Sequence, residues 1–127
     1  MRVIYIAGKF RGPSHWAIHE NIRAAERVAL SVWALGAAAL CPHLNTIHFQ
    51  DALPDDVWLA GDLALLGRCD ALMTVDNWRE SQGARAEVAY AHAHGIAVFH
   101  ELSALDAWLR APYTGRVTLA DQRSRNP

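Results

Sequence analysis

One segment near the N-terminus carries residue types suited to binding an anion. Residues 8–12 read Gly-Lys-Phe-Arg-Gly, so two basic side chains, Lys9 and Arg11, stand between Gly8 and Gly12. Glycine lets a backbone approach a ligand closely, and arginine can grip a phosphate with two parallel hydrogen bonds. The segment matches neither a Walker loop nor a Gly-x-Gly-x-x-Gly fingerprint. It predicts a phosphate-binding loop, with an ordinary strand-to-helix turn as the alternative.

Two acidic residues occupy positions from which a carboxylate could act on a sugar. Glu87 follows Ser81 and Gly83, and we expect it in the first turn of a helix, where the helix partial charge would keep it ionised. An ionised, positioned carboxylate is what attack on a sugar carbon requires. Asp62 falls among leucines close to an expected buried face, where it needs a partner or a function. For both residues, a plain helical carboxylate is the alternative.

Other chemistries find less support in the residue pattern. Cys41, His43 and His48 cluster in one segment, but their spacing fits no standard zinc pattern. We therefore expect neither a metal nor a cofactor. A Ser-His-Asp hydrolase is disfavoured because there is no Gly-x-Ser-x-Gly elbow. Trp78 lies in an expected polar loop and could stack on a nucleobase.

Strand-like and helix-like patterns alternate along the chain and must position these residues. Apolar runs at 3–7, 37–41, 71–75 and 96–99 predict strands. Helices are expected after Ser14 as N-cap, from Asp55, over 84–94, and from a capping box at 103–106, with a loop at 42–54. Leu59, Leu63 and Leu66 give the second helix an apolar stripe.

This alternation predicts an α/β fold with a parallel sheet and helices on both faces. We expect a flavodoxin-like or Rossmann-like sheet with the strand order 2-1-3-4. Ligands of such sheets bind beyond the carboxyl ends of the strands, where the strand order reverses. The loops at 8–12 and 76–83 should therefore lie side by side.

Length and charge set the remaining bounds. The 127 residues fit a single domain at 1–112, followed by a tail at 113–127. A net charge of −1, from 12 basic and 13 acidic residues, argues against a dedicated nucleic-acid binder. No apolar run is long enough for a signal-peptide core or a membrane span. The two cysteines are expected as free thiols in a reducing cytoplasm.

Three segments together resemble a known family. Residues 5–12 resemble the opening of the nucleoside 2-deoxyribosyltransferase superfamily and are especially similar to the 2′-deoxynucleoside 5′-monophosphate N-glycosidases. Residues 62–70 resemble the family's middle helix entering its third strand, and residues 81–87 are similar to its catalytic loop and helix. Residues 42–46, with Trp78 and residues 81–84, resemble a small branch found in bacteria and phages. The resemblance spans roughly residues 3–100.

The resemblance implies roles for individual residues. Glu87 would be the nucleophile that attacks the anomeric carbon, Asp62 would hold the sugar or the nucleophile, and Tyr5 would help to orient Glu87 or the sugar. Gly8, Arg11, Ser81 and Gly83 would surround a 5′-phosphate. The full set that we predict to bind the substrate is Gly8, Lys9, Arg11, Gly12, His43, Asn77, Trp78, Ser81 and Gly83.

The predicted function is hydrolysis, or transfer, of the N-glycosidic bond of a nucleoside or deoxynucleoside 5′-monophosphate through a covalent glycosyl-Glu87 intermediate. Lys9 and Arg11 favour a phosphorylated substrate, and the resemblance suggests a homodimer or tetramer. The alternative is a non-catalytic nucleotide-binding or regulatory module in which Glu87 only caps a helix. A phosphoribohydrolase of the lysine-decarboxylase-like type ranks last, because those proteins carry a Pro-Gly-Gly-x-Gly-Thr loop that is lacking here.

Overall fold

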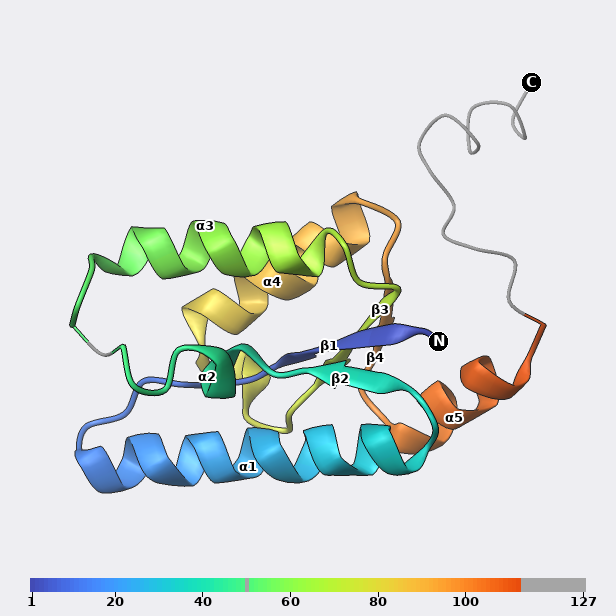
Figure 1. The fold of residues 1–127 in the computed structure, drawn as a ribbon, viewed down its shortest axis with the longest axis horizontal. Coiled ribbons are helices and arrows are strands. Elements are labelled where there is room, and N and C mark those ends of the chain that lie inside the picture. Colours follow the sequence, from blue (N-terminus) through green and yellow to red (C-terminus); the bar gives the residue numbers. More distant parts are fainter. Residues whose placement is uncertain (50, 113–127) are drawn as a thin grey trace.

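A four-stranded parallel sheet forms the centre of the protein (Figure 1), with the strand order β2-β1-β3-β4. The computed structural model describes residues 1–49 and 51–112. The sheet confirms the predicted α/β class and the 2-1-3-4 order. The strands are β1 (Val3–Ala7), β2 (Ala38–Leu40), β3 (Ala71–Thr74) and β4 (Ala97–Phe99).

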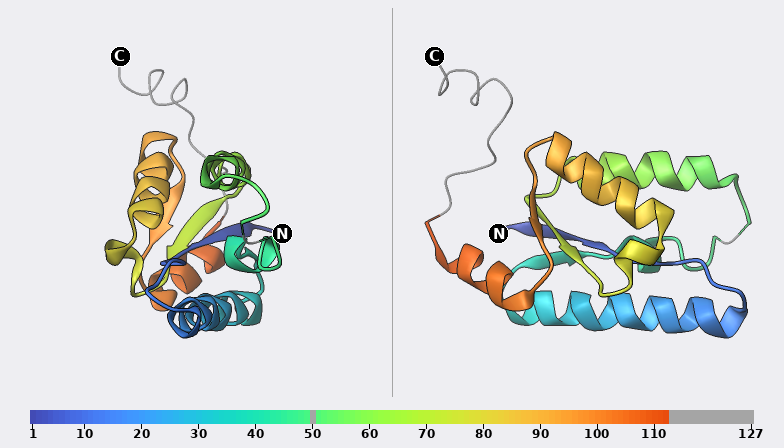
Figure 2. Two further views of the ribbon diagram at one scale, coloured as in Figure 1. Left: turned by 90° about the vertical axis from the view of Figure 1, so that its left-hand side faces the viewer. Right: turned by 180° about the vertical axis from the view of Figure 1, so that it is seen from behind.

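Helices follow each strand and cover both faces of the sheet (Figure 2). The helices are α1 (His15–Ala34), α2 (Pro42–Asn45), α3 (Asp55–Leu66), α4 (Gln82–Ala93) and α5 (Leu102–Arg110), with a 3-10 helix η1 (Trp78–Glu80). Helices α1 and α5 lie on one face of the sheet, and α3 and α4 lie on the other. The sheet is therefore sandwiched between two helical layers, as parallel sheets usually are.

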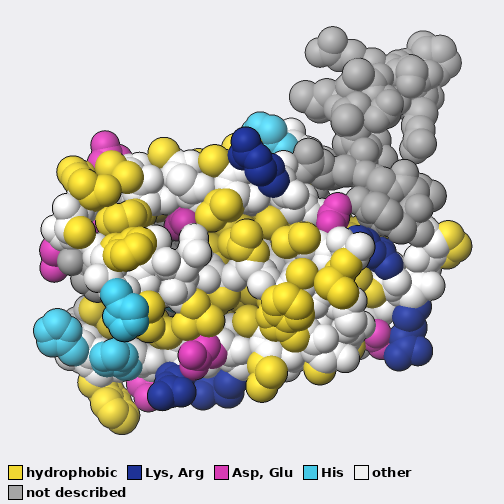
Figure 3. All heavy atoms as spheres, in the orientation of Figure 1, with side chains coloured by type: hydrophobic (Ala, Val, Ile, Leu, Met, Phe, Trp, Pro, Cys, Tyr) yellow, Lys and Arg dark blue, Asp and Glu magenta, His cyan; other side chains and the backbone are white. Residues whose placement is uncertain are grey.

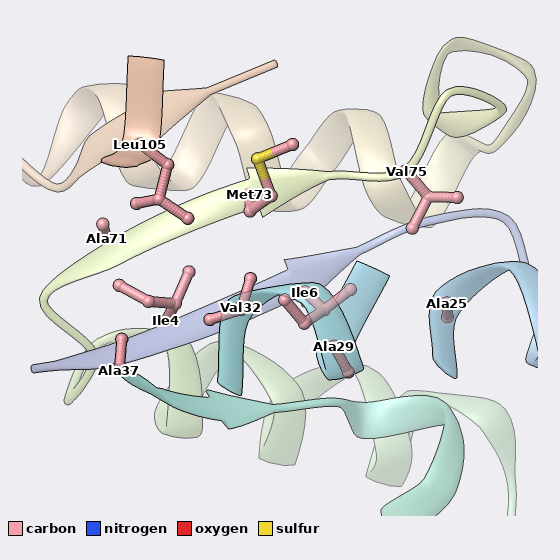
Figure 4. Close-up of a cluster of buried hydrophobic side chains, with 10 residues drawn as sticks. All are labelled: Ile4, Ile6, Ala25, Ala29, Val32, Ala37, Ala71, Met73, Val75 and Leu105. Carbon is pink, nitrogen blue, oxygen red and sulfur yellow. The ribbon is translucent and has the colours of Figure 1, made fainter. Parts of the chain in front are cut away.

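Alternation along β1 divides the core between the two layers. Successive strand residues point to opposite faces, so Ile4 and Ile6 pack with α1 and α5, as Figure 4 shows. Tyr5 and Ala7 point the other way and pack with residues of α3 and α4. The strand thus delivers the hydroxyl group of a completely buried tyrosine into the α3–α4 layer.

Several predicted helix ends are confirmed. Ser14 is the N-cap of α1, and its Oγ accepts a hydrogen bond of 3.1 Å from the Ala17 backbone N–H. Gly36 follows the helix with a φ of +89°, a conformation that glycine adopts without strain. Asp55 and Asp56 lie in the first turn of α3, as expected from the helix dipole.

Other local predictions were wrong. The expected loop at 42–54 contains the short helix α2. The last helix begins at Leu102, so Ser103 lies inside α5 and forms no capping box there. Leu59 is about half exposed, at 50%, so the predicted apolar stripe of α3 is buried only toward its C-terminal end.

Three further observations concern the chain as a whole. The described part of the predicted 1–112 domain contributes all four strands to one sheet. The predicted tail at 113–127 lies outside the described residues. Within residues 1–49 and 51–112, no helix has both the length and the apolar character needed to cross a membrane.

Candidate functional site

Two carboxyl groups and a hydroxyl group from three different elements meet in the α3–α4 layer. Tyr5 comes from β1, Asp62 from α3 and Glu87 from α4. The three groups are close enough that Asp62 and Glu87 each raise the pKa of Tyr5, and Asp62 raises the pKa of Glu87. The fold therefore brings together the three residues that the sequence singled out for catalysis.

Two polar atoms of this cluster have no hydrogen-bond partner. The Tyr5 hydroxyl and Oε2 of Glu87 are both buried, and nothing in the described part of the chain completes a hydrogen bond to either. The hydroxyl nevertheless lies near enough to the Glu87 carboxyl group to lower its pKa. Buried polar atoms are rarely left unpaired, because burial without a partner costs free energy. These two atoms therefore keep hydrogen-bonding capacity that a small movement toward each other, or a ligand, would satisfy.

Burial dominates the protonation of the cluster. It raises the pKa of Glu87 to about 7, and the negative charge of Asp62 adds to this rise while the Tyr5 hydroxyl opposes it. Burial also raises the pKa of Asp62 to about 6. The pKa of Tyr5 is raised by burial and then by Glu87 and Asp62, so the hydroxyl stays protonated.

The prediction that Glu87 lies in the first turn of its helix and stays ionised was wrong. Helix α4 begins at Gln82 rather than at Ala84, because Ser81 is its N-cap and accepts a hydrogen bond of 3.1 Å from the Ala84 N–H. Glu87 is consequently in the second turn, beyond the strongest part of the helix partial charge. Desolvation then outweighs the dipole and raises the pKa of Glu87.

The loop at 8–12 lies beside the loop that follows β3, as predicted. The Lys9 backbone N–H donates to Oδ1 of Asn77 at 3.0 Å, which joins the two loops at the carboxyl ends of β1 and β3. From α2, Nε2 of the buried His43 donates to the Lys9 carbonyl oxygen at 2.9 Å. Burial lowers the pKa of His43, and the hydrogen bond to the Lys9 carbonyl oxygen opposes part of this fall. Lys9, His43 and Asn77 thus form one connected unit.

Both cations of this loop already face acidic side chains. Nζ of Lys9 lies 3.9 Å from Oε1 of Glu80 in η1. Arg11 forms an ion pair with Asp55 at the start of α3, and both of these side chains are more than half exposed. Exposed pairs of this kind contribute little free energy, so an anionic ligand can compete for either cation.

The glycines of the site differ in the space that a side chain would have. A Cβ atom on Gly8 would lie 2.7 Å from Cγ2 of Val75, and one on Gly12 would lie 2.7 Å from Cβ of Ala17. Packing against neighbouring residues therefore accounts for both glycines. A Cβ atom on Gly83 would make only ordinary contacts, at 3.8 Å. The first turn of α4 is consequently open beside Gly83.

The start of α4 offers backbone donors near the two loops. Within the described residues, the N–H groups of Gln82 and Gly83 donate to no protein acceptor, whereas Ser81 and Ala84 are already bonded. Free N–H groups at a helix start attract anions. This arrangement fits the predicted place of Ser81 and Gly83 beside a phosphate.

The ring of Trp78 is already in contact with two neighbouring side chains. Its ring stacks on His100 with centroids 5.2 Å apart, and the Arg79 guanidinium lies 4.9 Å from the ring centroid. Nδ1 of His100 lies 2.9 Å from Oγ1 of the buried Thr74 at the end of β3. A base that stacked on Trp78 would compete with these neighbours or use the remaining ring surface.

In the described residues, no metal-binding cluster includes the carboxylates of Asp62 and Glu87, and a surface groove between α1, β2 and α2 does not include them either. In the described ranges, no group of three or more His, Cys, Asp and Glu side chains is arranged to hold a metal ion. Cys41 and Cys69 are free thiols. A groove between α1, β2 and α2 is lined mainly by apolar residues and lies on the face shown in Figure 3, where hydrophobic side chains are widespread. Its lining residues are Ala29, Trp33, Ala39, Leu40, Cys41, Leu44 and Asn45.

Sequence reasoning missed several residues that shape the site. Asn21 donates hydrogen bonds to the loop at 8–12. It lies three residues after Ile18 and four before Ala25, so a polar residue at the spacing of the apolar face of α1 could have indicated its role. Asp55 and Glu80 were not connected to Arg11 and Lys9, because the pairs join distant segments. Nothing in the local sequence indicated that His100 would stack on Trp78.

Comparison with known proteins places the chain in a family without assigning it an activity. No curated protein matches it. A family model matches residues 2–100, a range that holds all four strands and every residue of the predicted site. The chain therefore belongs to the family described as a domain of unknown function (DUF4406).

Proposed function

We propose that the protein cleaves the N-glycosidic bond of a nucleoside or deoxynucleoside 5′-monophosphate, by hydrolysis or by transfer to a second base. One observation carries this proposal. The carboxyl groups of Glu87 and Asp62 converge with the Tyr5 hydroxyl, and both the hydroxyl and Oε2 of Glu87 are buried without a partner. The resemblance to nucleoside 2-deoxyribosyltransferases supports the same assignment.

In the proposed reaction, the ionised carboxylate of Glu87 attacks the anomeric carbon of the sugar. A C–O bond forms, the C–N bond breaks, and its electron pair leaves with the base, which takes up a proton. Water then attacks the anomeric carbon and gives up a proton to solvent, which balances the proton taken up by the base. The C–O bond to Glu87 breaks, and the free carboxylate returns. In transfer, a second base takes the place of water. The Tyr5 hydroxyl orients the nucleophile by donating to it, and Asp62 accepts hydrogen bonds from the sugar.

The neighbouring loops supply a place for the 5′-phosphate. The loop at 8–12, with Lys9 and Arg11, lies against the loop that ends at the first turn of α4. Free N–H groups of Gln82 and Gly83, the exposed Arg11 and the partly buried Lys9 provide donors and charge for a dianion. A nucleoside without phosphate would use none of these groups.

The second candidate function is a nucleotide-binding module without catalysis. It is favoured by the pKa of Glu87, which burial raises to about 7. A carboxyl group with a pKa near 7 is about half protonated at neutral pH, and its protonated fraction cannot act as a nucleophile. In this case the loops would bind the nucleotide, and the buried cluster would contribute only to the ligand-dependent stability of the fold.

Base release separates the two functions. The wild type and Glu87→Gln would be incubated with ribo- and deoxyribonucleoside 5′-monophosphates, and free base would be measured by chromatography. Glu20→Gln is the matched control, because Glu20 is an exposed residue of α1. Release by the wild type and the control, but not by Glu87→Gln, supports the glycosidase. Release by all three proteins refutes Glu87 as the nucleophile. No release, with a nucleotide-dependent rise in melting temperature, favours the binding module.

Assembly and location belong to the same proposal. The resemblance suggests a homodimer or tetramer acting on a small nucleotide in the cytoplasm, without nucleic acid or membrane as a partner. Sedimentation analysis of the purified chain tests the assembly. A monomer at micromolar concentration would contradict it.

A further inference from the structure

Asn21 connects helix α1 to the loop at 8–12 through both hydrogens of its side-chain amide. Its Nδ2 donates to the carbonyl oxygens of Phe10 and Arg11, each at 3.1 Å. Its Oδ1 accepts from Nδ2 of Asn77 at 3.5 Å. One asparagine therefore uses two donors and one acceptor to link α1, the loop after β1 and the loop after β3.

These contacts use carbonyl groups of the loop backbone but leave several of its N–H groups without partners in the described part of the chain. Three consecutive carbonyl groups, of Lys9, Phe10 and Arg11, accept hydrogen bonds from His43 and Asn21. By contrast, the N–H groups of Phe10, Arg11 and Gly12 donate to no acceptor anywhere in residues 1–49 and 51–112. Backbone donors held in place without a partner are a ready site for an anion.

We propose that Asn21 is a positioning residue that fixes the backbone of residues 8–12 so that their free N–H groups can bind the phosphate of a nucleoside monophosphate. This inference rests on the proposed nucleotide ligand, but not on its cleavage. Only an uncharged amide meets the geometry, because an aspartate would present acceptors to the two carbonyl groups. A negative charge there would also disfavour the bound anion.

A merely structural role for Asn21 makes a different prediction. If its hydrogen bonds only stabilised the fold, their loss would weaken every ligand equally and would follow the loss of thermal stability. A positioning role instead weakens the ligands that carry a phosphate and spares the matching nucleosides. The ratio of the two affinities therefore distinguishes the roles.

The experiment compares Asn21→Ala and Asn21→Asp with the wild type by titration calorimetry. The probes are the four deoxyribonucleoside 5′-monophosphates, the corresponding deoxyribonucleosides and inorganic phosphate. Asn21→Asp serves as the second variant in case the smaller alanine destabilises α1. It keeps the side-chain volume and the acceptor toward Asn77. Ser31→Ala is the control, because it removes a hydrogen bond of 3.0 Å from another side chain of α1 to a backbone carbonyl far from the loop.

We expect both Asn21 variants to bind the preferred monophosphate at least tenfold more weakly, with the nucleoside affinity changed less than twofold. Inorganic phosphate binding should fall in parallel, and Ser31→Ala should resemble the wild type. Equal weakening of nucleotide and nucleoside would overturn the inference, as would unchanged nucleotide affinity or a wild type that prefers no phosphorylated ligand. A wild type that binds monophosphates through Asn21 but releases no base would refute the glycosidase alone.

Discussion

The buried hydroxyl group of Tyr5 lies beside the carboxyl group of Glu87, although one residue belongs to strand β1 and the other to helix α4. The hydroxyl lowers the pKa of the carboxyl group, whereas burial raises it to about 7. The balance between these two effects decides how much of Glu87 is ionised near neutral pH. If Glu87 is the nucleophile that we propose, Tyr5 would favour its reactive, ionised form.

The first prediction concerns Tyr5→Phe. Removing the hydroxyl removes an influence that favours the ionised carboxylate, so the pKa of Glu87 should rise further above 7. We expect base release at pH 7 to fall roughly 10- to 100-fold, because each unit by which the pKa rises lowers the ionised fraction of Glu87 by up to about tenfold. The pH profile of kcat/KM should move to higher pH, so that part of the loss is recovered at pH 9.

The folding of Tyr5→Phe serves as its internal control. The hydroxyl is buried without a hydrogen-bond partner, so its removal should change the free energy of unfolding by only about 1 kcal/mol or less. Tyr90→Phe, a half-buried change on α4, controls for loss of a phenolic hydroxyl elsewhere. An unshifted pH profile in Tyr5→Phe would contradict the coupling between Tyr5 and Glu87.

The second prediction is that the protein loses stability as pH rises. Burial raises the pKa values of Glu87 and Asp62 in the folded state to about 7 and about 6, from ordinary values of 4.5 and 3.8. The folded chain therefore binds more protons than the unfolded chain between these limits. Because stability increases with pH only where the unfolded state binds more protons, it must decrease here.

Urea unfolding at pH 5 and pH 8 measures this effect. One pKa unit corresponds to about 1.4 kcal/mol. Partial exposure of Asp62 reduces its share, and the lowered pKa of the buried His43 opposes the loss, so we expect a net loss of roughly 2 kcal/mol over this interval. Glu87→Gln, which has no titrating group at this position, should lose distinctly less. A wild type that is equally stable at both pH values would show that Glu87 is ionised throughout.

The fold was predictable from the sequence because its pattern repeats along the chain. Short apolar runs closed by polar or glycine residues alternate with helical periods, and a parallel sheet covered on both faces is the arrangement that buries all of them. Ser14 and Gly36 also marked the ends of α1 correctly, since caps depend on neighbouring residues only. The predicted capping box at 103–106 was wrong because α5 begins at Leu102, with Glu101 rather than Ser103 at its N-cap.

The site was predictable only as far as the topology determines it. The adjacency of Lys9 and Asn77 follows from the strand order. The protonation of Glu87 does not, because it depends on two additional residues at the start of α4 and on burial by elements far away in the sequence. The ion pair of Arg11 with Asp55 likewise depends on how the loop before α3 returns to the sheet.

The third prediction compares a glycine without space for a side chain, after β1, with a glycine that has space for one, inside α3. A Cβ atom on Gly8 would lie 2.7 Å from Val75, so Gly8→Ala should destabilise the fold by about 1–3 kcal/mol through overpacking. A Cβ atom on Gly61 would meet nothing within 4 Å inside α3. Gly61→Ala should therefore stabilise by about 0.5–1 kcal/mol, because alanine loses less chain entropy in a helix. Chemical denaturation measures both, and a stabilised Gly8→Ala would show that β1 and Val75 separate readily.

The fourth prediction is that Asp55 and Glu80 weaken phosphate binding. Each acidic side chain neutralises one cation of the loop at 8–12, Arg11 or Lys9, and a ligand phosphate must compete with it. Asp55→Asn and Glu80→Gln should therefore each tighten nucleoside monophosphate binding, by about two- to fivefold. This range follows from the worth of an exposed ion pair, about 0.2–1 kcal/mol.

Salt and a distant ion pair provide the controls for this effect. The gain in affinity should shrink as ionic strength rises, because salt screens exposed charges over about 10 Å. Asp106→Asn, which breaks the pair with Arg110 on α5, should leave nucleotide binding unchanged. Binding of the matching nucleoside should not respond to Asp55→Asn or to Glu80→Gln. Weaker nucleotide binding by Asp55→Asn or Glu80→Gln would mean that these carboxylates hold Arg11 and Lys9 in the orientation that grips the phosphate.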